Sequence, residues 1–383
     1  MSGSPGNIDA GLPQAPAAAW ATGVGDRLGL DWQPYHFRLP RALVTAHGAL
    51  NERRGWLLRL RGPEGLGWGE AVAWPGQEAK LAAALAPLGG VWRRRQLEGL
   101  LPSLPAPLAF ALGAALAEMA GEPIAGDGGW LEAPASAWLL PAGEAALPAL
   151  AACLERSSRS GEPTAQSAAP DGRLPAVALM ARNIGGVEPG AAAAAAPVPC
   201  TFKWKVAAGD DVQERDTLER LLALLPHTAR LRLDANGGWD RPTANAWARR
   251  LAAEPRLEWL EQPLDPSDRD GLLALAQRLP VALDESLRHV LPPPHPWPGW
   301  QVRRPLLEGD PRPLLAALRQ GQPRLMVSTA LETGIGRRWL AHLAALQSRG
   351  PTPAAPGLAP GWRPRGALFA ADPQRLWRAA GGP

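Results

Sequence analysis

The chain has 383 residues and a formal net charge of +4, and 46% of its residues are apolar while 20% are charged. Its basic residues are interspersed with acidic ones, so the charge pattern argues against a nucleic-acid-binding surface. Cys153 and Cys200 have no zinc-type spacing, and no apolar run is long enough to predict a membrane span. The N-terminus has neither the basic nor the apolar segment of a signal peptide, which favours a cytoplasmic location.

The first part of the chain predicts a tail followed by an α+β domain. Residues 1–30 are rich in Gly, Pro and Ala and predict a disordered or extended tail. Within residues 31–170, the runs Gly55–Leu60 and Gly67–Val72 predict two strands, which turn-forming residues separate. Apolar residues at helical spacing predict helices between residues 78 and 120.

Residues 171–350 predict a barrel of alternating strands and helices. Strand-like runs begin at intervals of about 20 to 30 residues, the length of one strand–helix unit. Consecutive parallel strands need crossover helices, so this regularity favours a parallel α/β barrel, and residues 351–383 are expected to pack back on the first domain. The predicted strands are Ala176–Met180, Thr201–Val206, Leu231–Leu233, Leu257–Leu260, Val281–Leu283, Trp300–Val302 and Leu325–Val327. The predicted crossover helices include Thr217–Leu225, Ala244–Ala253 and Gly271–Arg278.

Acidic residues follow three consecutive predicted strands. Asp234, Glu261 and Asp284 each stand directly after an apolar run. The carboxyl ends of barrel strands meet at one mouth, where catalytic residues of this fold lie. Three carboxylates together repel one another unless a cation lies between them, and oxygen-only ligation favours Mg²⁺. The sequence therefore predicts a magnesium site at the mouth of the barrel.

Two lysines on the preceding strand supply a candidate base. Lys203 and Lys205 are two residues apart and therefore point to the same face of a strand. A second ammonium group nearby favours loss of a proton from one of them, and a metal ion can stabilise the enolate that forms beside a carboxylate. Each acid taken alone is better explained by a helix N-cap or a turn, and the lysine pair by a solvated strand edge. Their order at successive strand ends favours the catalytic interpretation.

Several of these segments resemble the signatures of the enolase superfamily, in its muconate-lactonizing group, and within it the o-succinylbenzoate synthases. The resemblance implies a modified (β/α)7β barrel with an N-terminal α+β capping domain. The barrel segments that carry it are Phe202–Val206, Leu233–Gly237, Leu260–Pro263, Leu283–Ser286 and Val327–Gly336. The capping-domain segments are Thr45–Gly48, Arg54–Leu58 and Gly67–Glu70.

The resemblance also implies a reaction and a role for each site residue. The expected reaction is the Mg²⁺-dependent syn dehydration of 2-succinyl-6-hydroxy-2,4-cyclohexadiene-1-carboxylate to 2-succinylbenzoate, on the route to menaquinone or phylloquinone. The expected partner is therefore a small carboxylate. The implied roles are metal ligation by Asp234, Glu261 and Asp284, proton transfer by Lys205, carboxylate orientation by Lys203, and substrate or supporting hydrogen bonds from Arg232, Asn236 and Ser328.

One position departs from the family pattern. Where the family usually has a lysine on the sixth strand before a proline, this chain has Arg304 before Pro305. An arginine is not deprotonated in proteins and cannot act as a base, but it can present a fixed cation to the substrate. A racemase needs a proton-transfer group on each face, so Arg304 favours dehydration. An N-acylamino-acid racemase or dipeptide epimerase, and a non-catalytic barrel that binds a carboxylate, remain the alternatives.

Overall fold

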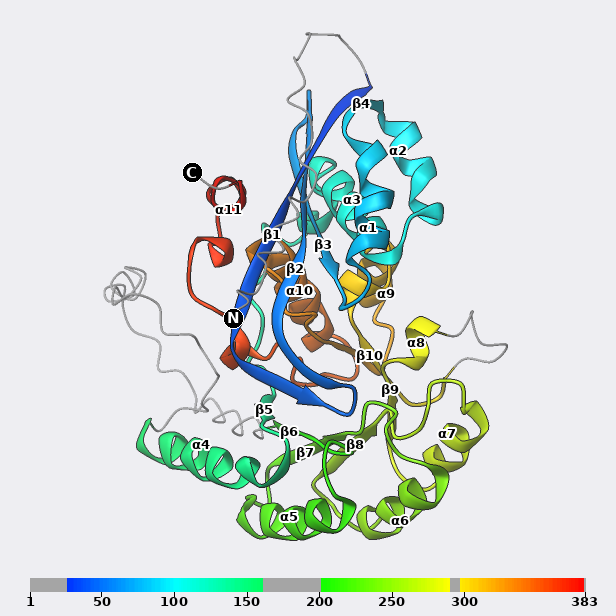
Figure 1. Cartoon of the computed structure of the whole chain (residues 1–383), viewed down its shortest axis with the longest axis vertical. Coiled ribbons are helices and arrows are strands. Elements are labelled where there is room, and N and C mark those ends of the chain that lie inside the picture. Colours follow the sequence, from blue (N-terminus) through cyan, green and yellow to red (C-terminus); the bar gives the residue numbers. More distant parts are fainter. Residues whose placement is uncertain (1–25, 161–200, 290–296, 382–383) are drawn as a thin grey trace, which may run out of the picture.

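The computed structural model describes residues 26–160, 201–289 and 297–381, which form two sheets and the helices that cover them (Figure 1). The predicted strand Ala176–Met180 lies outside the described residues, as do Cys200 and most of the predicted tail. Residues 27–30, assigned to the tail, instead begin the first strand. Among the described residues, no helix combines the length and hydropathy needed to cross a membrane.

The capping domain is an antiparallel sheet in the order β3-β2-β1-β4 with three helices. Both strands predicted here are present, within β2 and β3. Helix α3 lies close against β3 because glycines leave room for it: a Cβ on Gly69 would lie 1.9 Å from the Ala111 carbonyl oxygen, and one on Gly67 would lie 2.0 Å from that of Ala115. The elements are β1 Arg27–Thr45, β2 Gly48–Gly62, β3 Gly65–Ala73, α1 Glu78–Leu85, β4 Gly90–Arg93, α2 Arg94–Leu100 and α3 Ala106–Met119.

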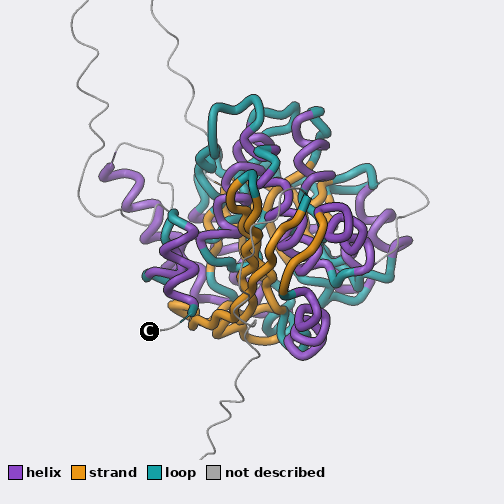
Figure 2. Tube along the Cα trace, turned by 90° about the horizontal axis from the view of Figure 1, so that it is seen from above, coloured by secondary structure: helices purple, strands orange, loops and turns teal. Residues whose placement is uncertain are grey.

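The second sheet is parallel and curled, in the order β11-β10-β9-β8-β7-β6-β5. Its outer face is covered by the crossover helices (Figure 1). Figure 2 shows the whole molecule from above, with strands near its centre and helices around them. This arrangement confirms the predicted fold class. The strands are β5 Trp138–Leu140, β6 Thr201–Lys205, β7 Arg230–Asp234, β8 Leu257–Glu261, β9 Val281–Leu283, β10 Trp300–Arg303 and β11 Leu325–Val327. The helices are α4 Ala146–Ser160, α5 Asp211–Leu224, α6 Arg241–Leu251, α7 Arg269–Ala276, α8 Ser286–His289, α9 Arg312–Arg319 and α10 Gly334–Ser348.

The parallel sheet begins earlier in the chain than the sequence predicts. Strand β5 pairs in parallel with β6, with Trp138 opposite Phe202, so the sheet extends into the range 31–170 that was assigned to the capping domain. All predicted strands from Thr201 onward are present as β6 to β11. After the sheet, α11 (Pro373–Ala380) lies against the capping domain, where the Trp377 ring is 5.7 Å from that of Trp68.

A buried carboxylate at the end of β3 joins the two domains. Glu70 is fully buried and accepts hydrogen bonds from the backbone N–H groups of Thr333 and Gly336, both at 2.8 Å, at the start of α10. It also accepts from the Thr333 hydroxyl at 2.6 Å and from the Tyr35 hydroxyl at 2.7 Å. Unpaired N–H groups and the helix dipole favour a negative charge at a helix N-terminus. Glu70 therefore caps a barrel helix from the capping domain.

Replacing this carboxylate should destabilise the whole protein. Glu70→Ala leaves four buried donors without an acceptor, each costing about 1–3 kcal/mol, so we expect the free energy of unfolding to fall by at least about 4 kcal/mol in urea titrations. The control is Glu64→Ala, which removes an exposed carboxylate paired with Arg94 and should change stability by less than about 1 kcal/mol. Equal effects of the two substitutions would contradict this role.

A second interdomain carboxylate, Glu118 of α3, predicts a pH dependence of stability. Burial raises its pKa to about 7, although Arg338, Trp339 and the backbone N–H of Trp68 all donate to it. A folded-state pKa above the unfolded value means that stability is greatest below the unfolded pKa and is lost as the pH rises through 7. Between pH 5 and 8, wild-type stability should fall by about 2–3 kcal/mol relative to Glu118→Gln. A pH-independent difference in unfolding free energy would exclude this effect.

Candidate functional site

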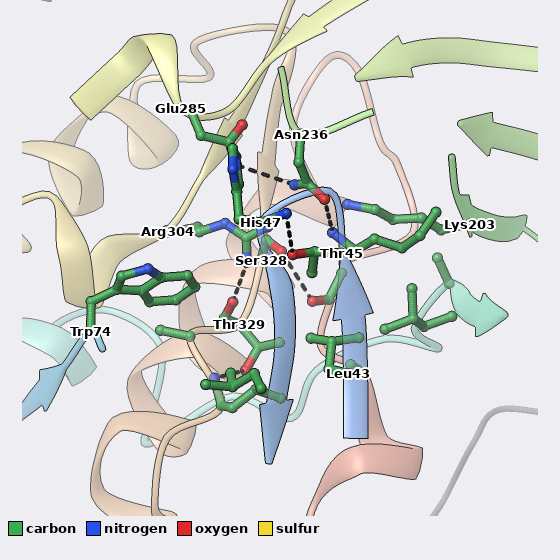
Figure 3. A pocket seen from close by; sticks show the side chains of 18 of the residues that line it. Leu43, Thr45, His47, Trp74, Lys203, Asn236, Glu285, Arg304, Ser328 and Thr329 are labelled. Atoms are coloured by element: carbon green, nitrogen blue, oxygen red, sulfur yellow. Dashed lines mark hydrogen bonds between the residues drawn. The ribbon is translucent and has the colours of Figure 1, made fainter. Parts of the chain in front are cut away.

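A hollow of about 830 Å³ lies between the β1–β2 hairpin and the carboxyl ends of the barrel strands (Figure 3). The hairpin side is mostly apolar, whereas the barrel side carries charged and polar groups. The capping domain contributes Leu43, Thr45, His47, Leu50 and Trp74. The barrel contributes, among others, Lys203, Lys205, Asn236, Glu285, Arg288, Arg304, Ser328 and Thr329.

Strand β6 points both predicted lysines into this hollow. Lys203 and Lys205 are 6% and 5% exposed, and the two-residue strand period places them on one face. The Lys203 Nζ lies 2.8 Å from Asp234 Oδ2 and 2.6 Å from Glu261 Oε1, and the Lys205 Nζ also lies 2.8 Å from Asp234 Oδ2. Burial opposes the charge on Lys203, but the Asp234 and Glu261 carboxylates outweigh it and raise its pKa. Lys203 is therefore held as the charged ammonium, which fits the role of a carboxylate-orienting cation better than that of a base.

The first two predicted ligands lie side by side around one ammonium group. Asp234 of β7 is the register partner of Glu261 of β8, and both are fully buried. Although burial acts in the opposite direction, Lys203 and Lys205 hold the pKa of Asp234 well below its usual range. Burial and the Asp234 charge raise the pKa of Glu261. The ammonium of Lys203 thus occupies the position between these carboxylates that a cation requires.

The third predicted ligand is held by two guanidinium groups. Asp284 accepts from Arg304 Nε at 2.8 Å and Arg304 Nη2 at 2.6 Å, and from Arg288 Nη1 at 2.9 Å. Burial alone would raise the pKa of Asp284, but Arg304 and Arg288 lower it to about 2. In the part of the chain that the structure describes, no three His, Cys, Asp or Glu side chains are grouped as one metal site. Asp284 is therefore near the other two acids but engaged by arginine.

Arg304 lies just beyond β10, and Figure 3 places it across the hollow from Lys203. Its Nη1 also donates to the Thr329 carbonyl oxygen. Despite burial, the Asp284 carboxylate raises the pKa of Arg304 above its already high value. It is a permanent cation with fixed geometry in this wall of the site.

Asn236 is placed by an unusual backbone conformation. Its φ is +46°, in the left-handed region that asparagine tolerates better than most residues, and its N–H donates to Asp234 Oδ1 at 3.0 Å. This turn brings its amide into the hollow, where the carbonyl accepts from Lys205 Nζ at 2.7 Å. Its Nδ2 donates to Glu285 Oε1 at 3.2 Å. Burial and the nearby Asp284 and Asp234 raise the pKa of Glu285 to about 7.

Of the two remaining residues predicted to contact substrate, Ser328 lines the hollow and Arg232 does not. Ser328 follows β11, lines the hollow and donates to the Gly357 carbonyl oxygen at 3.2 Å. Arg232 does not line it, because it lies one inward-facing layer below Asp234 on β7 and is completely buried. Its Nε donates to Glu258 at 2.6 Å, and its guanidinium lies 4.0 Å from the centre of the Trp259 ring. Arg232 is thus a core residue in this structure.

The sequence analysis missed Arg288 and the apolar wall. Arg288 is four residues after Asp284, a spacing that places both on one side of the short helix α8 and could have indicated the pair. Trp74 and the hairpin residues Leu43 and Leu50 had no comparable local signal, because they meet the barrel only through the tertiary fold.

The donor chemistry of the site fits a hard divalent cation. Its three acids offer only carboxylate oxygens, the preferred ligands of such ions, and Lys203 stands in for a cation between two of them. Asp234, Glu261 and Asp284 are the residues that could hold the ion.

Comparison with known proteins agrees with this architecture. The family model for the enolase C-terminal domain-like fold matches residues 190–291. The crystal structure of o-succinylbenzoate synthase from Thermosynechococcus elongatus BP-1, complexed with Mg in the active site, superposes with a TM-score of 0.66 and 29% identity, covering 92% of this chain and 99% of that one. In sequence and in fold, this chain is similar to proteins of the enolase superfamily. The dipeptide epimerase of Enterococcus faecalis V583 shares the fold, with a TM-score of 0.62, 16% identity and coverage of 86% and 90%.

Two relatives by sequence are o-succinylbenzoate synthases. The o-succinylbenzoate synthase of Thermosynechococcus vestitus is 44% identical over 153 residues, which span 37% of this chain and only 48% of the relative. That of Yersinia enterocolitica is 27% identical over 325 residues, covering 81% of this chain and 84% of the relative.

Proposed function

We propose that this protein is an o-succinylbenzoate synthase, a cytoplasmic lyase that dehydrates 2-succinyl-6-hydroxy-2,4-cyclohexadiene-1-carboxylate to 2-succinylbenzoate in menaquinone or phylloquinone biosynthesis. The observation that carries the proposal is the position of Lys205. Its ammonium faces the hollow beside the carboxylates at the strand ends, opposite a wall whose cation, Arg304, cannot release a proton. Relatives of that name in sequence and structure support it.

We propose Mg²⁺ as the cofactor, held by Asp234, Glu261 and Asp284, by analogy with the magnesium in the Thermosynechococcus structure. When bound, it would supply positive charge against the negative charge that develops on the substrate carboxylate. Its entry would release Lys203 from its contacts with Asp234 and Glu261. Lys203 would then be free to pair with the substrate carboxylate and orient it.

Lys205 carries out both proton transfers in this proposal. As the neutral amine, it takes the proton from C1, the ring carbon that bears the carboxylate, and becomes an ammonium, which then gives that proton to the hydroxyl leaving from C6 on the same face. The C1–H and C6–O bonds break, a C=C bond completes the aromatic ring, and water leaves. No oxidant or second base is required, so one lysine on one face is sufficient.

Arg304 separates this reaction from the racemase alternative. Racemisation would need a group on the opposite face to return a proton to the carbon, and a guanidinium held by Asp284 cannot do so at ordinary pH. Incubation with N-acylamino acids or dipeptides in D2O should therefore give no inverted product. A non-catalytic carboxylate-binding barrel would bind the cyclohexadiene substrate in calorimetry without converting it.

The direct test is turnover of the cyclohexadiene substrate by the purified protein, followed by aromatic absorbance. We expect Mg²⁺-dependent product formation that EDTA abolishes and added Mg²⁺ restores. Lys205→Ala and Lys205→Arg should each reduce kcat by roughly 10³-fold or more, since proton transfer contributes 10²–10⁴-fold and arginine keeps the charge but cannot serve as the base. Asp234→Asn should weaken Mg²⁺ binding measured by calorimetry.

Lys80→Ala, an exposed substitution on α1, is the control and should leave turnover unchanged. Absence of product from the wild-type protein at saturating Mg²⁺ would refute the proposed function. Retention of activity by Lys205→Arg would remove Lys205 from the role of base.

A further inference from the structure

The side-chain amide of Asn236 lies between the Lys205 ammonium, which donates a hydrogen bond to it, and the Glu285 carboxylate, which accepts one from it. On one side, its Oδ1 is 2.7 Å from the Lys205 Nζ. On the other, its Nδ2 is 3.2 Å from Glu285 Oε1 (Figure 3). These three side chains come from β6, from the turn after β7 and from the residue after Asp284, so they connect the ends of β6, β7 and β9, with β8 lying between the last two.

The two neighbours together permit only one orientation of the amide. An ammonium group has three donors and no acceptor, so the carbonyl of Asn236 must face Lys205. The amide nitrogen then faces Glu285, whose Oε1 accepts. The reversed amide would place its NH2 against the ammonium and its carbonyl against the carboxylate, which would be repulsive on both sides. Without Glu285, only the contact with Lys205 would select between the two orientations.

Burial and an ion pair limit the movement of Glu285, so its Oε1 can select the orientation of the Asn236 amide. Glu285 is mostly buried, and Arg288 lies on its Oε1 side, with Nη2 3.7 Å from that oxygen. Its Oε2 is buried and has no hydrogen-bond partner within the described part of the chain, so Oε1 is the oxygen that carries its interactions. Buried polar groups left with unused capacity are uncommon and often belong to functional networks.

We propose that Glu285 is a positioning residue that acts through Asn236: it fixes the amide so that the carbonyl of Asn236 holds the Lys205 ammonium at the reacting face of the substrate. The catalytic part of this inference rests on the proposed function, in which Lys205 transfers the proton. Glu285 does not contact the reacting atoms in this scheme. Its contribution is to keep the Lys205 Nζ from adopting other rotamers, both as the amine that takes the proton and as the ammonium that returns it.

The experiment compares two substitutions of nearly equal size. Glu285→Gln keeps an oxygen that accepts from Asn236 Nδ2, whereas Glu285→Leu keeps the bulk and removes the acceptor. We expect kcat of Glu285→Leu to fall roughly 10- to 100-fold with KM within about 3-fold, because misplacement of a reacting group slows chemistry more than binding. Glu285→Gln should stay within about 3-fold of wild type. The primary deuterium isotope effect on kcat/KM, with C1-deuterated substrate, should increase only in the leucine variant.

A double-mutant cycle tests whether Glu285 acts through Asn236. In an Asn236→Ala background, Glu285→Leu should have no further effect on kcat beyond about 2-fold. Independent, multiplying effects would overturn the proposal, as would a glutamine variant as slow as the leucine variant. Circular dichroism and unfolding curves of each variant establish that it is folded, and an unfolded leucine variant is replaced by Glu285→Met in the same cycle.

A measurement without turnover separates this inference from the proposed function. The side-chain amide protons of Asn236, observed by ¹⁵N NMR, should exchange slowly with solvent in wild type and Glu285→Gln and faster in Glu285→Leu. Equal exchange in all three proteins would refute the positioning role even if the enzyme is active. Inactive wild-type protein with this exchange pattern would reject the proposed substrate and keep the hydrogen-bonded arrangement.

Discussion

The structure of the site follows from the need to neutralise three buried carboxylates at adjacent strand ends. Asp234, Glu261 and Asp284 are at most 1% exposed, and isolated charges at such burial are prohibitively costly. The chain meets this need with cations from both sides of the mouth, Lys203 and Lys205 on β6 and Arg288 and Arg304 beyond β9 and β10. The barrel mouth is therefore built around a charge balance that a divalent ion can enter only by displacing a resident cation.

Much of the barrel could be predicted from the sequence, because its strands carry a strong local signal. Val281–Leu283 is apolar and followed directly by Asp284, and Thr201–Lys205 carries two lysines on one face; both patterns are typical of parallel strands with catalytic ends. Strand β5 could not be predicted in the same way. It has three residues, too few to show a period, and it is defined only by its pairing with β6.

Site residues could be predicted only where a sequence motif marks the carboxyl end of a strand, because residues there face the barrel mouth. Asp234 and Lys205 obey that rule, whereas Arg232 shares the face of Asp234 but lies one layer deeper, a distinction that residue spacing does not contain. The apolar wall depends on the β1–β2 hairpin reaching the barrel from more than a hundred residues away in the chain. Contacts of that range are decided by tertiary packing, which a local pattern does not encode.

The carboxylate of Glu70 has a consequence for how this protein can diverge. Glu70 belongs to the capping domain but accepts hydrogen bonds from the N-terminus of α10 in the barrel. Helix α10 begins a few residues after Ser328 and Thr329, which line the pocket. The two domains are therefore not interchangeable modules. A chimaera that takes its N-terminal half from a relative without an acid at this position would leave the backbone N–H groups of Thr333 and Gly336 without their acceptor. New specificities should therefore arise more readily by substitution within the hairpin than by exchange of whole domains.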